Sequence, residues 1–179
     1  KLIAKIINSA LAGGEGHVPS ALSILDIVNS LYEKIMNLDL IKKQSKHRDF
    51  FILSKGHGCM ALYVVLEKFK LIKKNDLDNF CSFNGILGGH PDSTKNKYIE
   101  ASTGSLGHGL PISVGISFAK KKLNYSGSVY SLVGDGECNE GSIWESAMLA
   151  SFYKLNNLKC IVDHNKSTNR ALNIDSIYQ

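Results

Sequence analysis

Two short apolar segments late in the sequence enclose a single segment with helical periodicity. Residues 128–133 and 158–162 are apolar and favour strands, whereas residues 141–153 repeat apolar side chains at helical spacing. A strand, a helix and a strand of these lengths form a right-handed crossover, which makes the two strands parallel neighbours. The sequence therefore predicts an α/β fold in which helices cover both faces of a parallel sheet.

The remaining segments fit the same class. An apolar run at 50–54 predicts another buried strand. Helices are expected at 1–12, 20–37, 58–71, 75–83 and 106–122, with Ser20 and Asn75 as caps. Residues 84–104 carry glycine and proline without periodicity, and a loop of this length inside a compact domain is usually functional. With 179 residues and neither linker nor repeat, we expect one domain.

Composition excludes several classes of protein. Hydrophobic residues make up 44% and charged residues 21%, which is normal for a globular chain and unlike a membrane-spanning one. The net charge of +5 comes from scattered groups such as Lys42–Lys43, Lys73–Lys74 and Lys120–Lys122, which favour a solvated surface over a nucleic-acid face. Four cysteines without a C-x-x-C pair suggest neither a zinc site nor disulfides. We therefore expect a cytoplasmic protein.

Oxygen-bearing side chains follow both late strands. Asp135 lies in Gly134–Asp135–Gly136 after the first, and Asn165 follows the second. Because parallel strands end at the same edge of a sheet, these two side chains can converge there. A carboxylate and an amide suit Mg²⁺ or Ca²⁺ if the phosphate oxygens of a ligand complete the shell. Gly134 and Gly136 would let a diphosphate approach the backbone.

The alternative is that Gly134–Gly136 forms an ordinary turn, since Asp-Gly is common in turns. The spacing favours the binding site, because the 28 residues between Gly136 and Asn165 accommodate one helix and one strand and little else.

Four of the six histidines directly follow glycine: His17, His57, His90 and His108. Ordinary glycine usage predicts about half of one such pair by chance. The spacings of 40, 33 and 18 residues lack the short pairs of zinc sites. Histidines lining a polar pocket explain the pattern better, although any single one could be a structural turn residue. The glycine-rich segment 103–109 before a helix is a weaker signal for phosphate binding.

Together these motifs resemble the amino-terminal, diphosphate-binding half of transketolases, and most closely the separately encoded amino-terminal subunit. The likeness covers nearly the whole chain. The motifs that carry it occur in the family's order: Gly16–His17, Ser54–Gly58, Gly88–Pro91, Thr103–Gly107, Gly134–Gly141 with Trp144–Glu145, and Asp163–Lys166.

The resemblance implies a thiamine diphosphate-binding fold and a set of site residues. Asp135, Asn165 and the backbone carbonyl of Ser167 match ligands of Mg²⁺ or Ca²⁺. The cofactor would contact a wider set: His57, Gly104, Leu106, Gly134, Asp135, Gly136, Glu140 and Asn165. Within it, Gly104 and Leu106 match positions on the aminopyrimidine side, and Glu140 matches a carboxylate at the subunit interface.

The implied reaction moves a two-carbon ketol unit from a ketose (phosphate) to an aldose (phosphate). His17, His57 and His90 match histidines that orient the sugar and assist proton transfer. In the family the glutamate that activates the aminopyrimidine lies on a separate pyrimidine-binding domain, to which no position here corresponds. We therefore expect residues 1–179 to form one diphosphate-binding domain, incomplete at both ends and active only with a partner subunit or domain, in an α2β2 or homodimer-like assembly.

Some positions depart from the family pattern. His108 stands where many members have glutamine, Val18–Ser20 replaces a glycine-rich run, and His164 precedes Asn165. These departures lie beside the expected substrate pocket more than in the expected metal site. Two rival hypotheses stay open: another thiamine diphosphate enzyme, such as a 1-deoxyxylulose-5-phosphate synthase or a 2-oxo-acid dehydrogenase E1 subunit, or a non-catalytic binding module.

Overall fold

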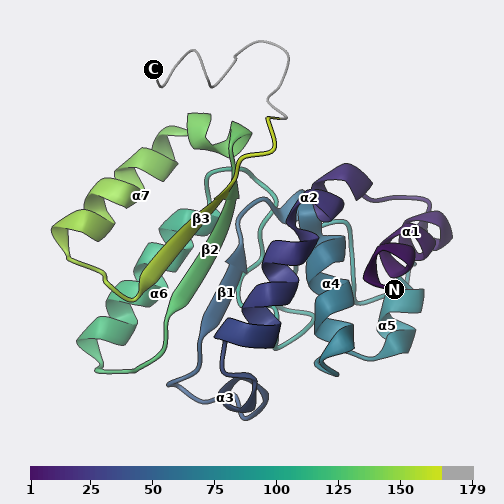
Figure 1. Ribbon diagram of the computed structural model, residues 1–179, viewed down its shortest axis with the longest axis horizontal. Coiled ribbons are helices and arrows are strands. Elements are labelled where there is room, and N and C mark those ends of the chain that lie inside the picture. The colour runs from purple at the N-terminus through teal and green to yellow at the C-terminus, as the bar shows by residue number, and fades with distance from the viewer. Residues whose placement is uncertain (167–179) are drawn as a thin grey trace.

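Three parallel strands form the sheet at the centre of the computed structural model, which describes residues 1–166 (Figure 1). In spatial order they are β1 (Phe50–Leu53), β2 (Val129–Gly134) and β3 (Leu158–Asp163). Leu53 pairs with Leu132, and Gly134 pairs with Asp163. The predicted parallel sheet is confirmed, and each strand begins and ends within one residue of the predicted bounds.

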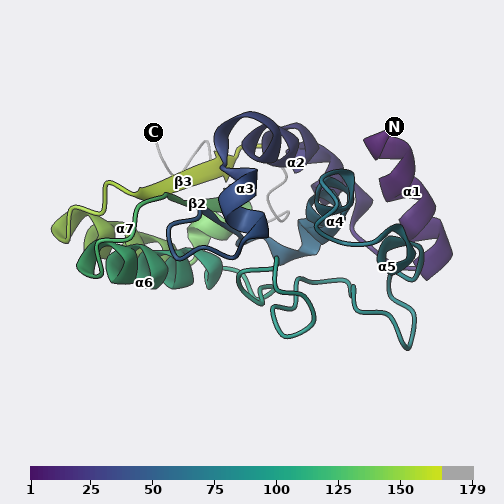
Figure 2. The ribbon, with the colours of Figure 1, turned by 90° about the horizontal axis from the view of Figure 1, so that it is seen from below.

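Helices cover both faces of this sheet, as predicted (Figure 2). The crossover helices α6 (Gly109–Lys122) and α7 (Gly141–Phe152) lie on one face, and α2 (Val18–Ser30) lies on the other. Beyond β1, α4 (Cys59–Lys68) packs against α2 and α1 (Leu2–Gly13), with α5 (Lys74–Asp78) beside it. Within residues 1–166, no helix combines the length and apolarity needed to cross a membrane.

The main core is built around α4. All eight residues from Cys59 to Leu66 are buried, so this helix is enclosed on every side. The chain enters α4 from β1 through a 3₁₀ turn, Gly56–Gly58. The position of His57 is therefore set by a buried strand before it and a buried helix after it.

The second helix differs from its prediction at both ends. It begins at Val18, and its N-cap is His17 rather than Ser20, because Pro19 suits the first helical turn, where no N–H partner is needed. After Ser30 the backbone changes to a π-helical turn, Leu31–Ile35, followed by a short unpredicted helix, α3 (Leu38–Lys42).

Two further expectations were wrong. Helix α5 starts at Lys74, so Asn75 is not its cap; the carboxylate of Asp76 accepts from the backbone N–H of Lys73 instead. Lys120 is not solvated surface, since it is 3% exposed and its ammonium donates to the backbone carbonyls of Lys46 and Arg48 at 3.2 and 3.0 Å. Amphipathic lysines can bury their stems when carbonyl oxygens satisfy the charged end.

The long loop predicted at 84–104 is confirmed, and its middle is attached to α4. The buried hydroxyl of Tyr63 lies 3.1 Å from the carbonyl oxygen of Gly88 and 2.9 Å from that of His90, to which it donates. The thiol of Cys59 donates to the carbonyl of Gly89 at 3.1 Å. These contacts fix the backbone that carries His90.

Tyr63→Phe should lower the free energy of unfolding by about 1–2 kcal/mol, because the carbonyl of His90 loses its donor in a buried position while the ring remains. Chemical denaturation measures this change. Tyr153→Phe is the matched control, since Tyr153 is 40% exposed. Equal losses in the two variants would contradict an anchoring role for the Tyr63 hydroxyl.

Candidate active site

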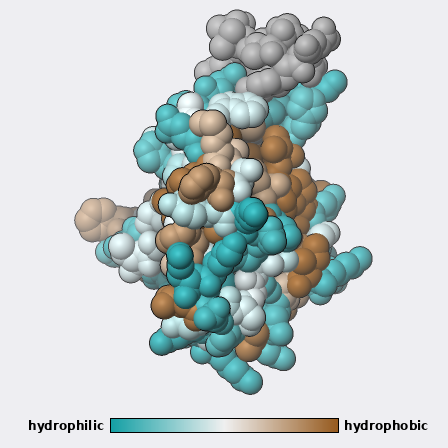
Figure 3. Space-filling view, turned by 90° about the vertical axis from the view of Figure 1, so that its left-hand side faces the viewer, coloured by the Kyte–Doolittle hydropathy of each residue, from teal (hydrophilic) through white to brown (hydrophobic). Residues whose placement is uncertain are grey.

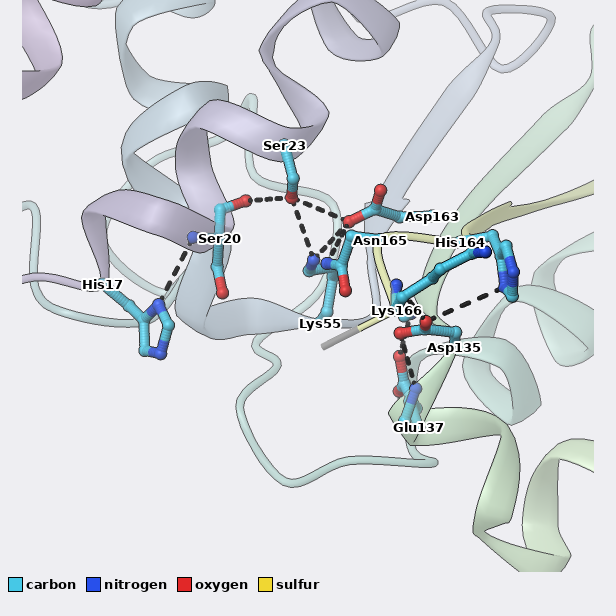
Figure 4. A network of polar contacts seen from close by, with 12 residues as sticks. His17, Ser20, Ser23, Lys55, Asp135, Glu137, Asp163, His164, Asn165 and Lys166 are labelled. Carbon is cyan, nitrogen blue, oxygen red and sulfur yellow. Dashed lines mark hydrogen bonds and ion pairs between the residues drawn. The ribbon is translucent and has the colours of Figure 1, made fainter. Parts of the chain in front are cut away.

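The carboxyl ends of β2 and β3 bring Asp135 and Asn165 to one edge of the sheet (Figure 4). The backbone N–H of Asp135 donates to the carbonyl of Asp163 at 3.1 Å, which extends the ladder beyond β2. Asp135 is 3% exposed, and its carboxylate accepts from the backbone N–H groups of Gly136 and Lys166 at 2.9 and 2.8 Å. This carboxylate is therefore held in place by the backbone on either side of the site.

Asn165 forms a hydrogen bond with Asp163, an acidic residue that the sequence analysis did not select as a site residue. Its amide nitrogen donates to Oδ2 of Asp163 at 2.9 Å, and the ammonium of Lys55 lies 2.6 Å from the same oxygen. Burial raises the pKa of Asp163, but hydrogen bonds from Lys55 and Ser23 outweigh it and leave that pKa below its usual value. A lysine directly after the apolar run at 50–54 is the signal that could have revealed this pair.

Glu137 is a second buried carboxylate that sequence reasoning named only as part of a motif. It is 1% exposed and accepts from the Ser54 hydroxyl, from the backbone N–H of Gly107 at 2.8 Å and from that of Gly134 at 3.1 Å. These donors belong to the end of β1, the glycine-rich loop and the end of β2. Glu137 thus holds together the three segments around the site.

The glycine-rich loop packs so closely that side chains would not fit. Gly107 has φ +81°, and a Cβ there would lie 2.4 Å from Oγ of Ser142. A Cβ on Gly104 would lie 2.8 Å from the ring of His90, and one on Gly56 would lie 2.8 Å from the backbone nitrogen of Gly104. The loop therefore lies between the 3₁₀ turn of His57 and the loop of His90.

Three of the predicted histidines come together. The rings of His17 and His57 are 5.2 Å apart at an interplanar angle of 61°. His17 caps α2, and its Nδ1 accepts from the backbone N–H of Ser20 at 3.3 Å. His90 lies against Gly104 and is close enough to affect His57 electrostatically. His108 is exposed, and its Nδ1 lies 3.2 Å from the carbonyl oxygen of Leu106.

His57 is neutral at physiological pH. Partial burial, reinforced by the positive charge of Lys55 and by His17 and His90, lowers its pKa from 6.5 to about 4. A neutral imidazole can both donate and accept a hydrogen bond, which suits contact with hydroxyl and carbonyl groups of a ligand.

The remaining predicted residues lie around the same edge of the sheet. Gly134 ends β2 and is buried, Gly136 begins a 3₁₀ turn (Gly136–Asn139), Leu106 is half-buried, and Glu140 is the exposed N-cap of α7. Ser167 lies outside the described residues.

The donor set suits a hard cation that arrives with its own oxygen ligands. Among residues 1–166, no group of three or more His, Cys, Asp or Glu side chains could hold a metal. Asp135 and Asn165 offer a carboxylate and an amide at adjacent strand ends, which fits Mg²⁺ or Ca²⁺ only if phosphate oxygens complete the coordination. The donor set is therefore compatible with a cation that a phosphate-bearing ligand brings with it.

Comparison with known proteins identifies the family. The family model described as "Transketolase, thiamine diphosphate binding domain" matches residues 5–173. The chain belongs to this family. This confirms the resemblance found in the sequence motifs.

Individual relatives agree with this assignment. An apulose-4-phosphate transketolase subunit from Actinobacillus succinogenes is 40% identical over 161 residues, covering 90% of this chain and 58% of that protein. The protein of the same name from Phocaeicola vulgatus is 39% identical over 182 residues, covering 99% and 63%. The transketolase structure from Leishmania mexicana has a TM-score of 0.81 at 26% identity, covering 90% of this chain and 26% of that one. The chain spans about three fifths of the length of these two curated relatives.

The lowered pKa of His57 makes stability depend on pH. Between about pH 6.5 and 4 the unfolded chain binds a proton that the folded chain does not, so acid favours unfolding. We expect the contribution of His57 to the free energy of unfolding to be fully present above pH 6.5 and to be lost as the pH falls toward 4. In His57→Gln, the free energy of unfolding should fall less steeply over this interval.

Denaturation at several pH values measures this slope. The control is His108→Gln at an exposed position of a neighbouring loop. The same change of slope in both variants would contradict the assignment to His57.

Proposed function

We propose that this chain supplies the thiamine diphosphate- and metal-binding half of a transketolase. The enzyme would transfer a two-carbon ketol unit from a ketose or ketose phosphate to an aldose or aldose phosphate. The observation that carries the proposal is the position of the histidine cluster beside the strand ends that bear Asp135 and Asn165. Lys55 connects the two parts, because it precedes His57 by two residues and pairs with Asp163.

The proposed metal ligands are Asp135, Asn165 and the carbonyl of Ser167, and the metal is Mg²⁺ or Ca²⁺. The proposed cofactor contacts are His57, Gly104, Leu106, Gly134, Asp135, Gly136, Glu140 and Asn165. Thiamine diphosphate, when bound, supplies a nucleophilic carbon and an electron sink for carbon–carbon cleavage.

The histidines would act on the sugar. Since Nδ1 of His17 accepts a backbone hydrogen bond, its neutral form carries the proton on Nε2 and can donate it to a sugar oxygen. His57 would hydrogen-bond to the sugar as a neutral imidazole. His90, which lies on the long loop, would add a third imidazole to the same pocket. In these roles all three histidines would orient hydroxyl and carbonyl groups of the sugar and assist proton transfer.

A second chain, or another part of the same protein, would provide the glutamate that activates the aminopyrimidine. The two curated relatives are each named as one subunit of a transketolase, which supports a separate partner. The surface of α7 supports it as well, since Trp144, Met148, Leu149 and Phe152 are 47–77% exposed. Figure 3 looks onto this side and shows hydrophobic side chains gathered there.

A cavity of about 610 Å³ adjoins this surface and is walled mainly by α7 and β3. Together with exposed Glu140 at the start of α7, it supports an α2β2 or homodimer-like assembly in which residues 1–179 act as one diphosphate-binding domain. The four cysteines are spread along the chain without a C-x-x-C pair, which fits a reducing compartment such as the cytoplasm.

The reaction is tested by offering the protein with its partner a ketose phosphate plus an aldose phosphate. In separate assays it is offered the 2-oxo acid pyruvate, alone and together with an aldehyde. We expect ketol transfer and no decarboxylation. Decarboxylation alone would favour a 2-oxo-acid dehydrogenase, and condensation of pyruvate with an aldehyde would favour a 1-deoxyxylulose-5-phosphate synthase.

Asp135→Ala should abolish Mg²⁺-dependent binding of thiamine diphosphate, because the carboxylate is the only charged member of the proposed metal set. Isothermal titration calorimetry of the protein with its partner measures the affinity, and the melting temperature without ligand checks the fold. Asp78→Ala, which breaks an exposed ion pair with Lys74, is the control. Unchanged affinity in Asp135→Ala would refute the metal site.

A further inference from the structure

Lys55 and Asp163 form a buried ion pair between the ends of β1 and β3. The Lys55 ammonium lies 2.6 Å from Oδ2 of Asp163, and the side chains are 2% and 8% exposed. Removing two charges from water is costly, and an apolar pair of similar volume often stabilises a fold equally well. Stability alone therefore does not explain why charged residues occupy these positions.

One oxygen of this ion pair, Oδ2 of Asp163, accepts several hydrogen bonds. Oδ2 of Asp163 accepts from Lys55 Nζ at 2.6 Å, from the Ser23 hydroxyl at 2.8 Å and from Nδ2 of Asn165 at 2.9 Å (Figure 4). An ionised carboxylate only accepts hydrogen bonds, and pairing with an ammonium favours the ionised form. The amide of Asn165 must consequently turn its nitrogen toward Asp163.

This orientation matters because the two ends of an amide differ chemically. The oxygen of an asparagine side chain can ligate a hard cation, whereas its NH₂ group cannot. With a neutral residue at 163 that both donates and accepts, either end of the Asn165 amide could face it. In the structure, Oδ2 of Asp163 lies 2.6 Å from the Lys55 ammonium and accepts from Nδ2 of Asn165 at 2.9 Å, so the nitrogen end of the amide faces Asp163.

We propose that Lys55 and Asp163 are positioning residues that hold the Asn165 amide with its nitrogen inward, so that its oxygen is presented to the metal. This inference rests on the proposed function, and in particular on Asn165 as a ligand. It assigns to β1, which supplies no metal ligand, a part in building the metal site.

The test removes both charges at once, because removing one would leave the other buried without a partner. In the full-length protein with its partner, Lys55→Met/Asp163→Leu should fold but bind thiamine diphosphate with Mg²⁺ roughly 10–100-fold more weakly, the usual cost of losing residues that orient a metal ligand. Calorimetry measures affinity, and melting without ligand measures stability. Raising the Mg²⁺ concentration should restore binding.

The matched control is Arg48→Met/Glu100→Leu. Arg48 and Glu100 form an ion pair at 2.9 Å, and their side chains are 14% and 9% exposed. Arg48 lies before the amino end of β1, whereas the proposed metal site lies at the carboxyl ends of the strands. Removal of this ion pair should leave cofactor affinity unchanged. If leucine at 163 prevents folding, Lys55→Met/Asp163→Asn keeps the side-chain shape and should show the same loss and the same rescue.

The outcomes separate the two proposals. A folded double variant with unchanged affinity would overturn the positioning role alone. A loss that Mg²⁺ does not rescue, or an equal loss in the control, would also overturn it by indicating general damage. Absence of Mg²⁺-dependent binding in the unaltered protein would overturn the proposed function together with this inference.

Discussion

The parallel direction of β1, β2 and β3 is the constraint on which the site depends. Because all three strands end at one edge, the turns that follow them meet there, although Lys55, Asp135 and Asp163 are far apart in sequence. The crossovers through α6 and α7 enforce this direction, since a hairpin would place successive turns at opposite edges. The polar contacts that build the site join the turns at this edge.

At this edge, buried charges replace the apolar packing found elsewhere. Glu137 binds the ends of β1 and β2 to the glycine-rich loop, and Lys55 with Asp163 joins β1 to β3. Buried polar groups become costly as soon as one partner is missing, so a fully satisfied network has few alternative arrangements. The result is a network of buried polar contacts at the carboxyl ends of all three strands.

The three histidines lie beside this network, and the segment that carries each one is held in a different way. His57 is held between a buried strand and a buried helix, His17 is the cap of α2, and His90 lies on a loop that Tyr63 attaches to α4. The closeness of these segments depends on glycine, because a Cβ at Gly104 or Gly56 would collide with its neighbours. The same closeness, with Lys55 nearby, keeps His57 neutral.

The sequence by itself determined the fold class, the three strands and the edge at which Asp135 and Asn165 lie, because periodicity and crossover handedness are local or nearly local properties. It also pointed to His17, His57 and His90 through the glycines beside them. Tertiary structure alone decided the partners: that Lys55 meets Asp163, that Glu137 receives three donors, that Lys120 is buried and that His17 rather than Ser20 caps α2. Such pairings depend on which distant segments pack together, and hydrophobic periodicity carries no information about the partner of a buried charge.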